Sequence, residues 1–260
     1  MVIAYLSGVG KRDNVLKALA SSFVAEFRDC SSTVLGKPCM FFGFDAMPQL
    51  KQCWGQRPFI YIDHAYLKRG YETGNFRVVV DHIHQTKLLD APGDRVKRLE
   101  VRVYDWRKGR EVIVLEPSRN VCTVLGVSPR WAEETALRLK NYTDRPIRIK
   151  SKGPGLFGEL KDCHAVVGLS SVAEVEAAIF GIPVFATEHS PAAPIAEKDF
   201  SKIESPIYPD RDAWLRSLSY AQWHVSEMSD GSTKRHLERV LDGDFDQLDA
   251  REHCVGRRAI

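Results

Sequence analysis

The chain has 260 residues, 44% of them hydrophobic, so it can bury a core and we do not expect disorder over most of its length. Its formal net charge of +3 neither requires nor excludes a polyanionic partner. The six cysteines form no CxxC pair, and no apolar run approaches the ~20 residues that span a bilayer. These features predict a reduced, cytoplasmic protein without membrane contact.

The N-terminal part of the chain predicts a Rossmann-like lobe. An apolar run at 2–6 is followed by a glycine turn, 7–11, and then by apolar residues at helical spacing, which predicts a strand, a turn and a helix. Further buried strands are predicted at 37–43, 58–63 and 76–80. The glycine turn lacks the third glycine of the dinucleotide fingerprint, because Asp13 stands there. We expect Gly8 to approach a ligand without holding a free nucleotide alone.

A second lobe is predicted from Arg110 onward. Its expected strands lie at 111–115, 146–150, 165–169 and 182–186, its helices at 131–142 and 172–180, and one long amphipathic helix at 212–228. Strands and helices that alternate in this way predict parallel sheets covered on both faces. The chain after residue 229 is polar and is predicted to be loosely attached.

The segment 164–185 carries most of the functional information. A buried strand runs into Ser170 and Ser171, which can cap the next helix, while its first N–H groups, from Val172 on, offer a phosphate site. Glu176 follows about one and a half turns into the helix, where a carboxylate can accept hydrogen bonds from ribose hydroxyls. A capping serine and a solvated glutamate on an ordinary βαβ unit explain the same residues, and both interpretations stay open here.

The pattern Ser-Ser-x-x-x-x-Glu-Ala-x-x-x-Gly-x-Pro-Val at 170–184 resembles the donor-binding motif of GT-B-type glycosyltransferases. The resemblance implies a nucleotide-sugar donor, a UDP-sugar first of all, in place of a permanently bound cofactor. It places Ser170, Ser171 and Val172 at the diphosphate and Glu176 at the ribose. It also implies that strand-end cations neutralise the leaving diphosphate, here Arg148, Lys150 and Lys152. Glu188 follows the next strand and is expected near the donor sugar.

The resulting fold prediction is α/β, with two Rossmann-like lobes of GT-B type and a short N-terminal lobe. The predicted parts are an acceptor-side lobe at 1–109, a nucleotide-sugar-binding lobe at 110–210, a helix at 211–229 that crosses back to the first lobe, and a tail at 230–260. The phrases at 61–66, 143–147 and 203–206 are similar to GT-B-like proteins of tailed bacteriophages. This similarity implies double-stranded DNA with hydroxymethylated pyrimidines as the acceptor, in the host cytoplasm.

Sugar transfer needs a base that deprotonates the acceptor. Asp63 and His64 follow a buried strand, so they are expected at its carboxyl end, with Asp63 as the preferred base and His64 orienting it or binding the acceptor. A strand-end aspartate that makes a turn is the structural alternative. A DNA acceptor further predicts phosphate contacts, for which the candidates are Arg69, Arg77, Arg95 and Arg98.

Tyr66, His82 and His84 are expected to contact the acceptor. His82 and His84 form a His-x-His pair, but the sequence offers no third ligand, so we predict no metal site. The sequence leaves two other functions open: an epimerase or glycan-directed transferase of the same fold, and a non-catalytic binding protein.

Overall fold

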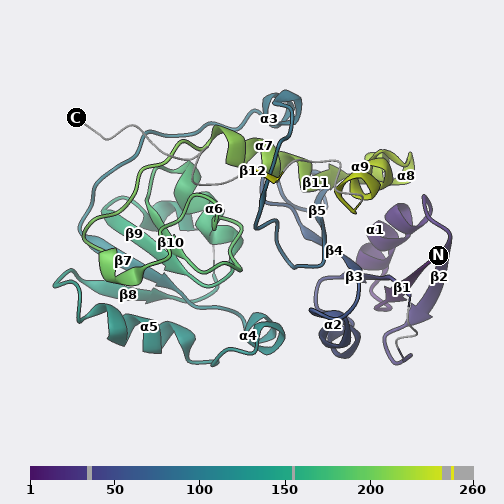
Figure 1. The fold of residues 1–260 in the computed structure, drawn as a ribbon, viewed down its shortest axis with the longest axis horizontal. Helices are drawn as coiled ribbons and strands as arrows, with labels where there is room; N and C mark the ends of the chain where they lie inside the picture. The colour runs from purple at the N-terminus through teal and green to yellow at the C-terminus, as the bar shows by residue number, and fades with distance from the viewer. Residues whose placement is uncertain (34–36, 154–155, 242–246, 249–260) are drawn as a thin grey trace. The chain divides into compact units, whose positions relative to one another are not determined.

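The computed structural model describes residues 1–33, 37–153, 156–241 and 247–248 (Figure 1). The chain divides into two compact units. Unit 1 comprises Met1–Gln85, Ala91–Leu99 and Arg216–Asp246, and unit 2 comprises Thr86–Asp90, Glu100–Leu215 and Gln247–Ile260. The boundary before Arg216 falls inside helix α7 (Asp212–Tyr220). Each unit is described by itself below.

Unit 1 is built on a six-stranded sheet in the order β11-β5-β4-β3-β1-β2. The strands are β1 (Val2–Leu6), β2 (Ala25–Asp29), β3 (Cys39–Phe42), β4 (Phe59–His64), β5 (Asn75–Val80) and β11 (Gln222–His224). The four strands β4, β3, β1 and β2 are parallel, whereas β5 and β11 are antiparallel to their neighbours. The prediction of purely parallel sheets is therefore wrong for this unit, because the link from β4 to β5 is too short for a helical crossover.

The helices of unit 1 are α1 (Gly10–Ala20), α2 (Met47–Cys53), α3 (Asp94–Leu99), α8 (Val225–Ser229) and α9 (Ser232–Leu241). Helix α1 buries Leu16 and Leu19 in a core that also contains Met40 of β3. Leu237 of α9 belongs to the same core. The described part of the predicted loose tail, up to residue 241, is thus a packed helix.

The predicted single helix at 212–228 is two helices separated by a strand. After α7 the backbone of β11 pairs antiparallel with β5, and α8 follows directly. The side chain of Gln222 donates to the carbonyl of Leu67 at 3.1 Å and accepts from its N–H at 2.9 Å, which fixes the strand in place. Apolar spacing alone misses this break, because an edge of the sheet offers the backbone an alternative to the helix.

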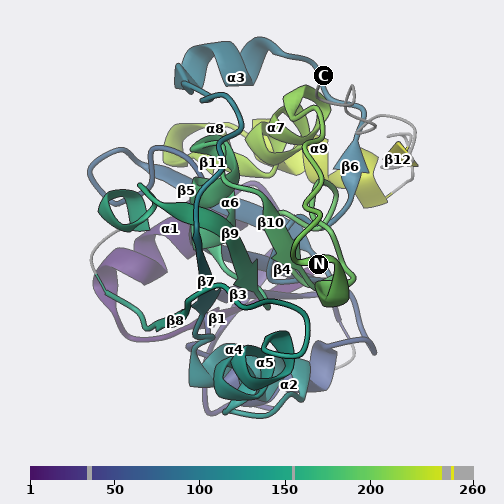
Figure 2. The ribbon, with the colours of Figure 1, turned by 90° about the vertical axis from the view of Figure 1, so that its left-hand side faces the viewer.

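Unit 2 contains an all-parallel sheet in the order β10-β9-β7-β8, whose strands lie side by side in both ribbon views (Figures 1 and 2). The strands are β7 (Glu111–Leu115), β8 (Ile147–Lys150), β9 (Cys163–Gly168) and β10 (Val184–Ala186). The helices are α4 (Arg119–Leu125), α5 (Trp131–Leu139) and α6 (Val172–Ile179), with short 3-10 turns at Leu156–Glu159 and Phe200–Lys202. A two-stranded pair, β6 (Leu88–Leu89) with β12 (Gln247–Leu248), completes the unit.

Buried strand β9 forms the centre of unit 2. All its residues are buried, and Ala165 and Val167 pack with Val112, Val114 and residues of α5 in one apolar cluster. A strand buried on both faces reads as a continuous apolar run, which is why the sequence predicts it well. No helix in the described ranges combines the length and the apolar character that crossing a membrane demands.

Candidate functional site

Helix α6 begins at the carboxyl end of β9, the end at which parallel sheets bind ligands. Ser171 is its N-cap, and the Ser171 hydroxyl accepts a hydrogen bond from the Ala173 N–H at 3.1 Å. The N–H of Glu174 donates to the Ser171 carbonyl at 3.2 Å. Within the described ranges the N–H of Val172 meets no acceptor. One free N–H at the positive end of a helix dipole is suited to an anion.

The loop after β10, residues 187–190, is tied to the start of α6. Ser170 Oγ donates to the His189 carbonyl at 2.9 Å, and Thr187 Oγ1 donates to the Leu169 carbonyl at 2.7 Å. Ser170 is 6% exposed and its hydroxyl hydrogen is engaged by the His189 carbonyl, and its contact with a diphosphate stays a prediction. Ser171 is only half-buried, so its hydroxyl hydrogen is still available to a ligand.

Two carboxylates predicted from the sequence flank this helix start. Glu176 is half-buried on α6, and Glu188 lies in the loop with its side chain 74% exposed, 3.8 Å from His189 Nε2. Both positions leave the carboxylates accessible to a ligand. The roles of these two residues at the ribose and at the sugar stay predictions.

Glu174 is a carboxyl group of this region that the sequence reasoning missed. Its side chain is fully buried, and burial raises its pKa to about 8, against the opposing effect of the Ser190 hydroxyl that donates to Oε2. The signal in the sequence was Ser171-x-x-Glu174, the spacing of a capping box. The spacing predicts a helix start, but it does not predict the complete burial of the carboxyl group.

The cations of β8 are already paired with carboxylates of the same unit. Arg148 contacts Glu111 at 2.9 and 3.0 Å and also pairs with Glu159, and these bonds raise its pKa. Lys150 Nζ lies 3.0 Å from Glu159. Arg148 reaches Glu111 at the amino end of β7, away from the carboxyl end of the sheet, and its role at a leaving diphosphate stays a prediction. Lys152 is exposed and free of these pairs.

The glycine turn of unit 1 is occupied by its own chain. The N–H groups of Ser7 and Gly8 donate to the carboxylate of Asp13 at 2.8 and 3.0 Å. Gly8 has a φ of +78°, which favours glycine in this turn. The Asp13 carboxylate thus engages both N–H groups of this turn, and the contact of Gly8 with the donor stays a prediction.

Asp63 and Arg77 form a buried network at the end of β4. Asp63 Oδ2 accepts from Arg77 Nη2 at 2.7 Å and from the Tyr61 hydroxyl at 3.1 Å, while Oδ1 accepts from the His64 N–H at 2.7 Å. The Arg77 side chain is 6% exposed. Both oxygens of Asp63 are engaged, which argues against Asp63 as a base. Buried Arg77 cannot contact a DNA phosphate, so that prediction is wrong.

His64 is exposed at the carboxyl end of β4. Its ring meets the ring of Tyr71 edge-on, at 5.4 Å between centroids and 88° between planes, and Lys11 Nζ lies 5.8 Å from the Tyr71 centroid. Imidazole is the side chain best suited to exchange a proton near neutral pH. An exposed imidazole thus lies at this strand end, whereas both oxygens of the Asp63 carboxylate are engaged.

The other predicted acceptor contacts are partly withdrawn from solvent. Tyr66 is buried, its hydroxyl accepts from the Gln85 N–H at 2.8 Å, and burial raises its pKa to about 12. His84 is buried, and its N–H donates to Nδ1 of half-buried His82 at 3.0 Å. Burial contradicts surface contacts for Tyr66 and His84. Among the described residues no group of three His, Cys, Asp or Glu side chains is arranged to hold a metal.

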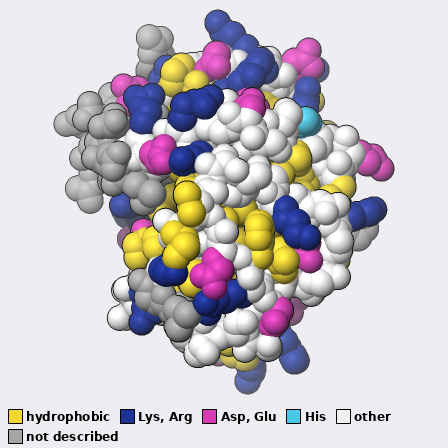
Figure 3. Space-filling view, turned by 90° about the vertical axis from the view of Figure 1, so that its right-hand side faces the viewer, with side chains coloured by type: hydrophobic (Ala, Val, Ile, Leu, Met, Phe, Trp, Pro, Cys, Tyr) yellow, Lys and Arg dark blue, Asp and Glu magenta, His cyan; other side chains and the backbone are white. Residues whose placement is uncertain are grey.

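The predicted phosphate contacts differ in exposure. Arg95 is buried against Glu227, at 2.8 and 2.9 Å, and donates to the carbonyls of Ser219 and Gln222, so its predicted surface role is wrong. Arg69 and Arg98 are exposed. On the face drawn in Figure 3, basic side chains are interspersed with acidic ones and form no continuous basic stripe.

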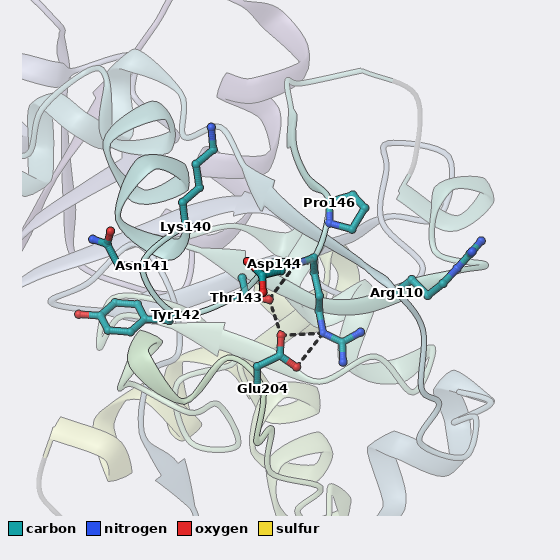
Figure 4. Close-up of a pocket in the computed structure, with 9 residues that line it drawn as sticks. Arg110, Lys140, Asn141, Tyr142, Thr143, Asp144, Pro146 and Glu204 are labelled. Carbon is teal, nitrogen blue, oxygen red and sulfur yellow. Dashed lines mark hydrogen bonds and ion pairs between the residues drawn. The ribbon is translucent and has the colours of Figure 1, made fainter.

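An open depression of about 650 Å³ lies at the amino ends of β7 and β8, at the opposite end of the sheet from the start of α6 (Figure 4). Glu204 accepts hydrogen bonds there from Thr143 and, at 2.9 and 3.0 Å, from Arg145, and these bonds lower its pKa. The sequence phrases at 143–147 and 203–206 thus meet in one polar network. The network ties β8 to a distant loop, and it contains none of the predicted site residues.

Comparison with known proteins gives structural similarity only. No family model and no curated protein sequence matches the chain. The solved structure of Thermosulfurimonas dismutans KpsC, beta Kdo 2,4 transferase, is similar with a TM-score of 0.50 and 10% identity, over 85% of this chain and 91% of that chain. The beta Kdo 2,7 transferase of the same KpsC gives a TM-score of 0.49 and 11% identity, over 96% of both chains. The first similarity concerns the fold alone: like that structure, the chain has a mixed α/β fold with parallel strands.

Proposed function

We propose that this protein is a glycosyltransferase that moves a sugar from a nucleotide diphosphate donor, a UDP-sugar first of all, to a hydroxyl acceptor. The observation that carries the proposal is the start of α6, at the carboxyl end of an all-parallel sheet in a glycosyltransferase-like fold. Val172 supplies a free N–H and Ser171 a hydroxyl for the diphosphate, and Glu176 supplies a carboxylate for the ribose.

We assign acceptor activation to His64 of unit 1. In the proposed reaction the imidazole takes the proton of the acceptor hydroxyl, the oxygen forms a bond to the anomeric carbon, and the nucleoside diphosphate leaves with the electron pair of the broken bond. The exposure of His64 supports this assignment, and the engagement of both oxygens of Asp63 disfavours the alternative.

For the acceptor we propose only its chemical class, a compound with a free hydroxyl group. Modified DNA loses support, because Arg77 and Arg95 are buried and only Arg69 and Arg98 of its four predicted phosphate contacts are exposed. A salt titration decides this point, since DNA binding through phosphates weakens steeply as salt rises.

The test is a thermal-shift screen with nucleoside mono- and diphosphates and their sugar conjugates. A ligand at about 100 times its Kd stabilises the folded state by about 2.7 kcal/mol, so at least one nucleotide is expected to raise the Tm. Glu176→Ala is expected to abolish the shift without lowering the Tm of the unliganded protein. Exposed Glu133 of α5 supplies the control, Glu133→Gln, which retains the shift. No shift with any nucleotide, or an equal shift in Glu176→Ala, overturns the proposed site.

The same screen leads to an activity assay that separates the alternatives. A transferase releases free nucleotide from the bound sugar conjugate when an acceptor is present, whereas an epimerase returns a nucleotide-sugar of changed configuration. A non-catalytic binding protein shows the shift and leaves the conjugate unchanged.

A further inference from the structure

Glu174 is a buried carboxyl group that the proposed donor chemistry does not use. Its Oε2 accepts a hydrogen bond from Ser190 Oγ, whereas Oε1 has no hydrogen-bond partner among the described residues, although the Ser171 N–H faces the carboxyl group. A buried carboxylate with one bare oxygen is costly. The raised pKa of about 8 agrees with this geometry, and the neutral acid is the stable form.

Gly168 makes room for this carboxyl group at the end of β9. A Cβ atom at this position would lie 1.9 Å from Glu174 Oε1 and 2.5 Å from its Cδ. Real Cβ atoms do not approach other atoms so closely, so any larger residue here requires the Glu174 side chain to move. The backbone of β9 and the side chain of Glu174 are thus fitted to each other directly before the start of α6.

Ser190 links Glu174 to the loop that flanks the helix start. The Ser190 hydroxyl also accepts from the Ala192 N–H at 2.9 Å, and the Ser190 N–H donates to the Thr187 carbonyl at 3.2 Å. An ionised Glu174 needs water or further donors, and these reach it only if the loop moves away. The protonation state of Glu174 is therefore coupled to the position of residues 187–190.

Titratable and charged groups lie on each segment packed against α6. They are Glu176 on α6 itself, Glu188 and His189 in the loop, Cys163 and His164 at the far end of β9, Glu159 in the neighbouring 3-10 turn, Tyr104, Asp105 and Arg107 in the chain beside the end of α6, and Asp210, Arg211 and Asp212 at the start of α7. None of them contributes to the raised pKa of Glu174, which burial causes, opposed by the hydroxyl of Ser190 and the N–H of Ser171.

We propose that Glu174, as a neutral acid, is a positioning residue that holds residues 187–190 against the start of α6 and thereby sets the affinity of that helix start for a phosphate-bearing ligand. The ligand part of this inference rests on the proposed function, and the conformational part does not. Glu174→Gln keeps a neutral group of the same length, so it preserves the loop at every pH. Glu174→Asp is one methylene too short to reach Ser190 in the same way.

The experiment compares the wild type, Glu174→Gln, Glu174→Asp and the control Glu133→Gln at about pH 6.5 and about pH 9. Hydrogen-exchange protection factors of residues 187–193 report the loop, and calorimetric titration with UDP reports the site. One pH unit above its pKa a carboxyl group is about nine-tenths ionised, so wild-type protection and UDP affinity are each expected to fall about tenfold. For Glu174→Gln we expect the loop protection and the UDP affinity to be the same at both pH values. Glu174→Asp is expected to show low protection and low UDP affinity at both pH values, and Glu133→Gln to follow the wild type.

The outcomes separate this inference from the proposed function. If Glu174→Gln shows the same pH dependence as the wild type, Glu174 does not hold the loop and the inference fails, while UDP binding still supports the proposed function. If the loop responds as expected but UDP binds to no variant, the ligand part and the proposed function fail together, and the conformational role of Glu174 stands.

Discussion

Arg77 on β5 and Asp63 on β4 form a buried ion pair, with 2.7 Å between Nη2 and Oδ2. The two residues are register partners on antiparallel strands, and the guanidinium lies 5.5 Å from the ring centroid of Tyr61 and 5.8 Å from that of Tyr66. A charge in such surroundings is tolerated only while its partner is present. The pair therefore fixes β5 against β4 at the strand end that carries His64.

Replacement of Arg77 by Met is expected to lower the free energy of unfolding by about 3 kcal/mol, because it leaves Asp63 without its buried partner. This value is at the lower end of the stability loss that follows removal of one partner from a buried ion pair, because the Asp63 side chain is still 21% exposed. Arg110→Met breaks an ion pair that is 84% and 53% exposed and is expected to cost less than about 1 kcal/mol. Urea denaturation measures both, and equal losses would contradict the structural role of Arg77.

Gly168→Ala is expected to destabilise the protein by about 1–3 kcal/mol, the usual cost of overpacking, because the new methyl group would overlap Glu174. Glu174→Ala removes the side-chain atoms that the new methyl group of Gly168→Ala would overlap. The double variant is therefore expected to be more stable than the sum of the two single changes predicts. A double-mutant cycle by thermal or urea denaturation gives the coupling energy. Strict additivity would show that the two residues do not meet.

Glu174 also predicts how stability depends on pH. Its pKa is raised in the folded state from about 4.5 to about 8, so the folded protein binds one more proton than the unfolded chain between these values. The contribution of Glu174 to stability is complete below about pH 4.5 and is lost as pH rises to about 8, by at most about 1.4 kcal/mol per pH unit. Glu174→Gln is expected to gain stability over the wild type steadily across this window. A difference in Tm between the two proteins that stayed constant with pH would refute the raised pKa of Glu174.

His236 predicts the opposite dependence in unit 1. It is buried beside the rings of Tyr220 and Trp223, and burial lowers its pKa to about 4, with Arg95 and Arg239 adding to the effect. The unfolded chain then binds the extra proton between about pH 4 and 6.5, so stability falls as pH is lowered through this range. His236→Gln is expected to reduce that loss of Tm on acidification. An unchanged acid profile would show that His236 ionises freely.

His64→Gln tests the proposed base. Removing a general base typically costs about 10²- to 10⁴-fold in rate, so kcat is expected to fall by this amount while UDP affinity is unchanged. Asp63→Asn is expected to act mainly on stability, because Asp63 is paired with Arg77. If Asp63→Asn lost activity and His64→Gln retained it, the assignment of the base would be reversed.

The sequence predicts well what local apolar patterns determine. The strand at Val2–Leu6 and the unit of β9, α6 and β10 lie where apolar runs and capping residues place them. The sequence does not predict pairings between distant segments. Phe27 continues the apolar spacing of α1 but belongs to β2, and Gln222–His224 lie within the helical pattern at 212–228 but form β11, because in both cases the backbone pairs with a strand elsewhere in the chain.

Charged residues of the candidate site were the least predictable. Composition shows that Arg77, Arg95 and Arg148 are cations, but each is neutralised by a carboxylate at least fourteen positions away along the chain. Such partners are identified only once the fold brings them together. The helix start at Ser171 and Val172 was predictable, because an N-cap depends on neighbouring residues.

The pairing of β11 with β5 sets an order for folding during synthesis. Gln222–His224 leave the ribosome only after all of the central segment Glu100–Leu215, so until then the nascent chain carries β5 with an open edge. An open edge invites pairing with other chains, and chaperones commonly guard such intermediates. Truncated chains that stop before His224 would keep that edge permanently open. A fragment that isolates the N-terminal half should therefore include the segment from Arg216 onward, supplied in trans or by circular permutation.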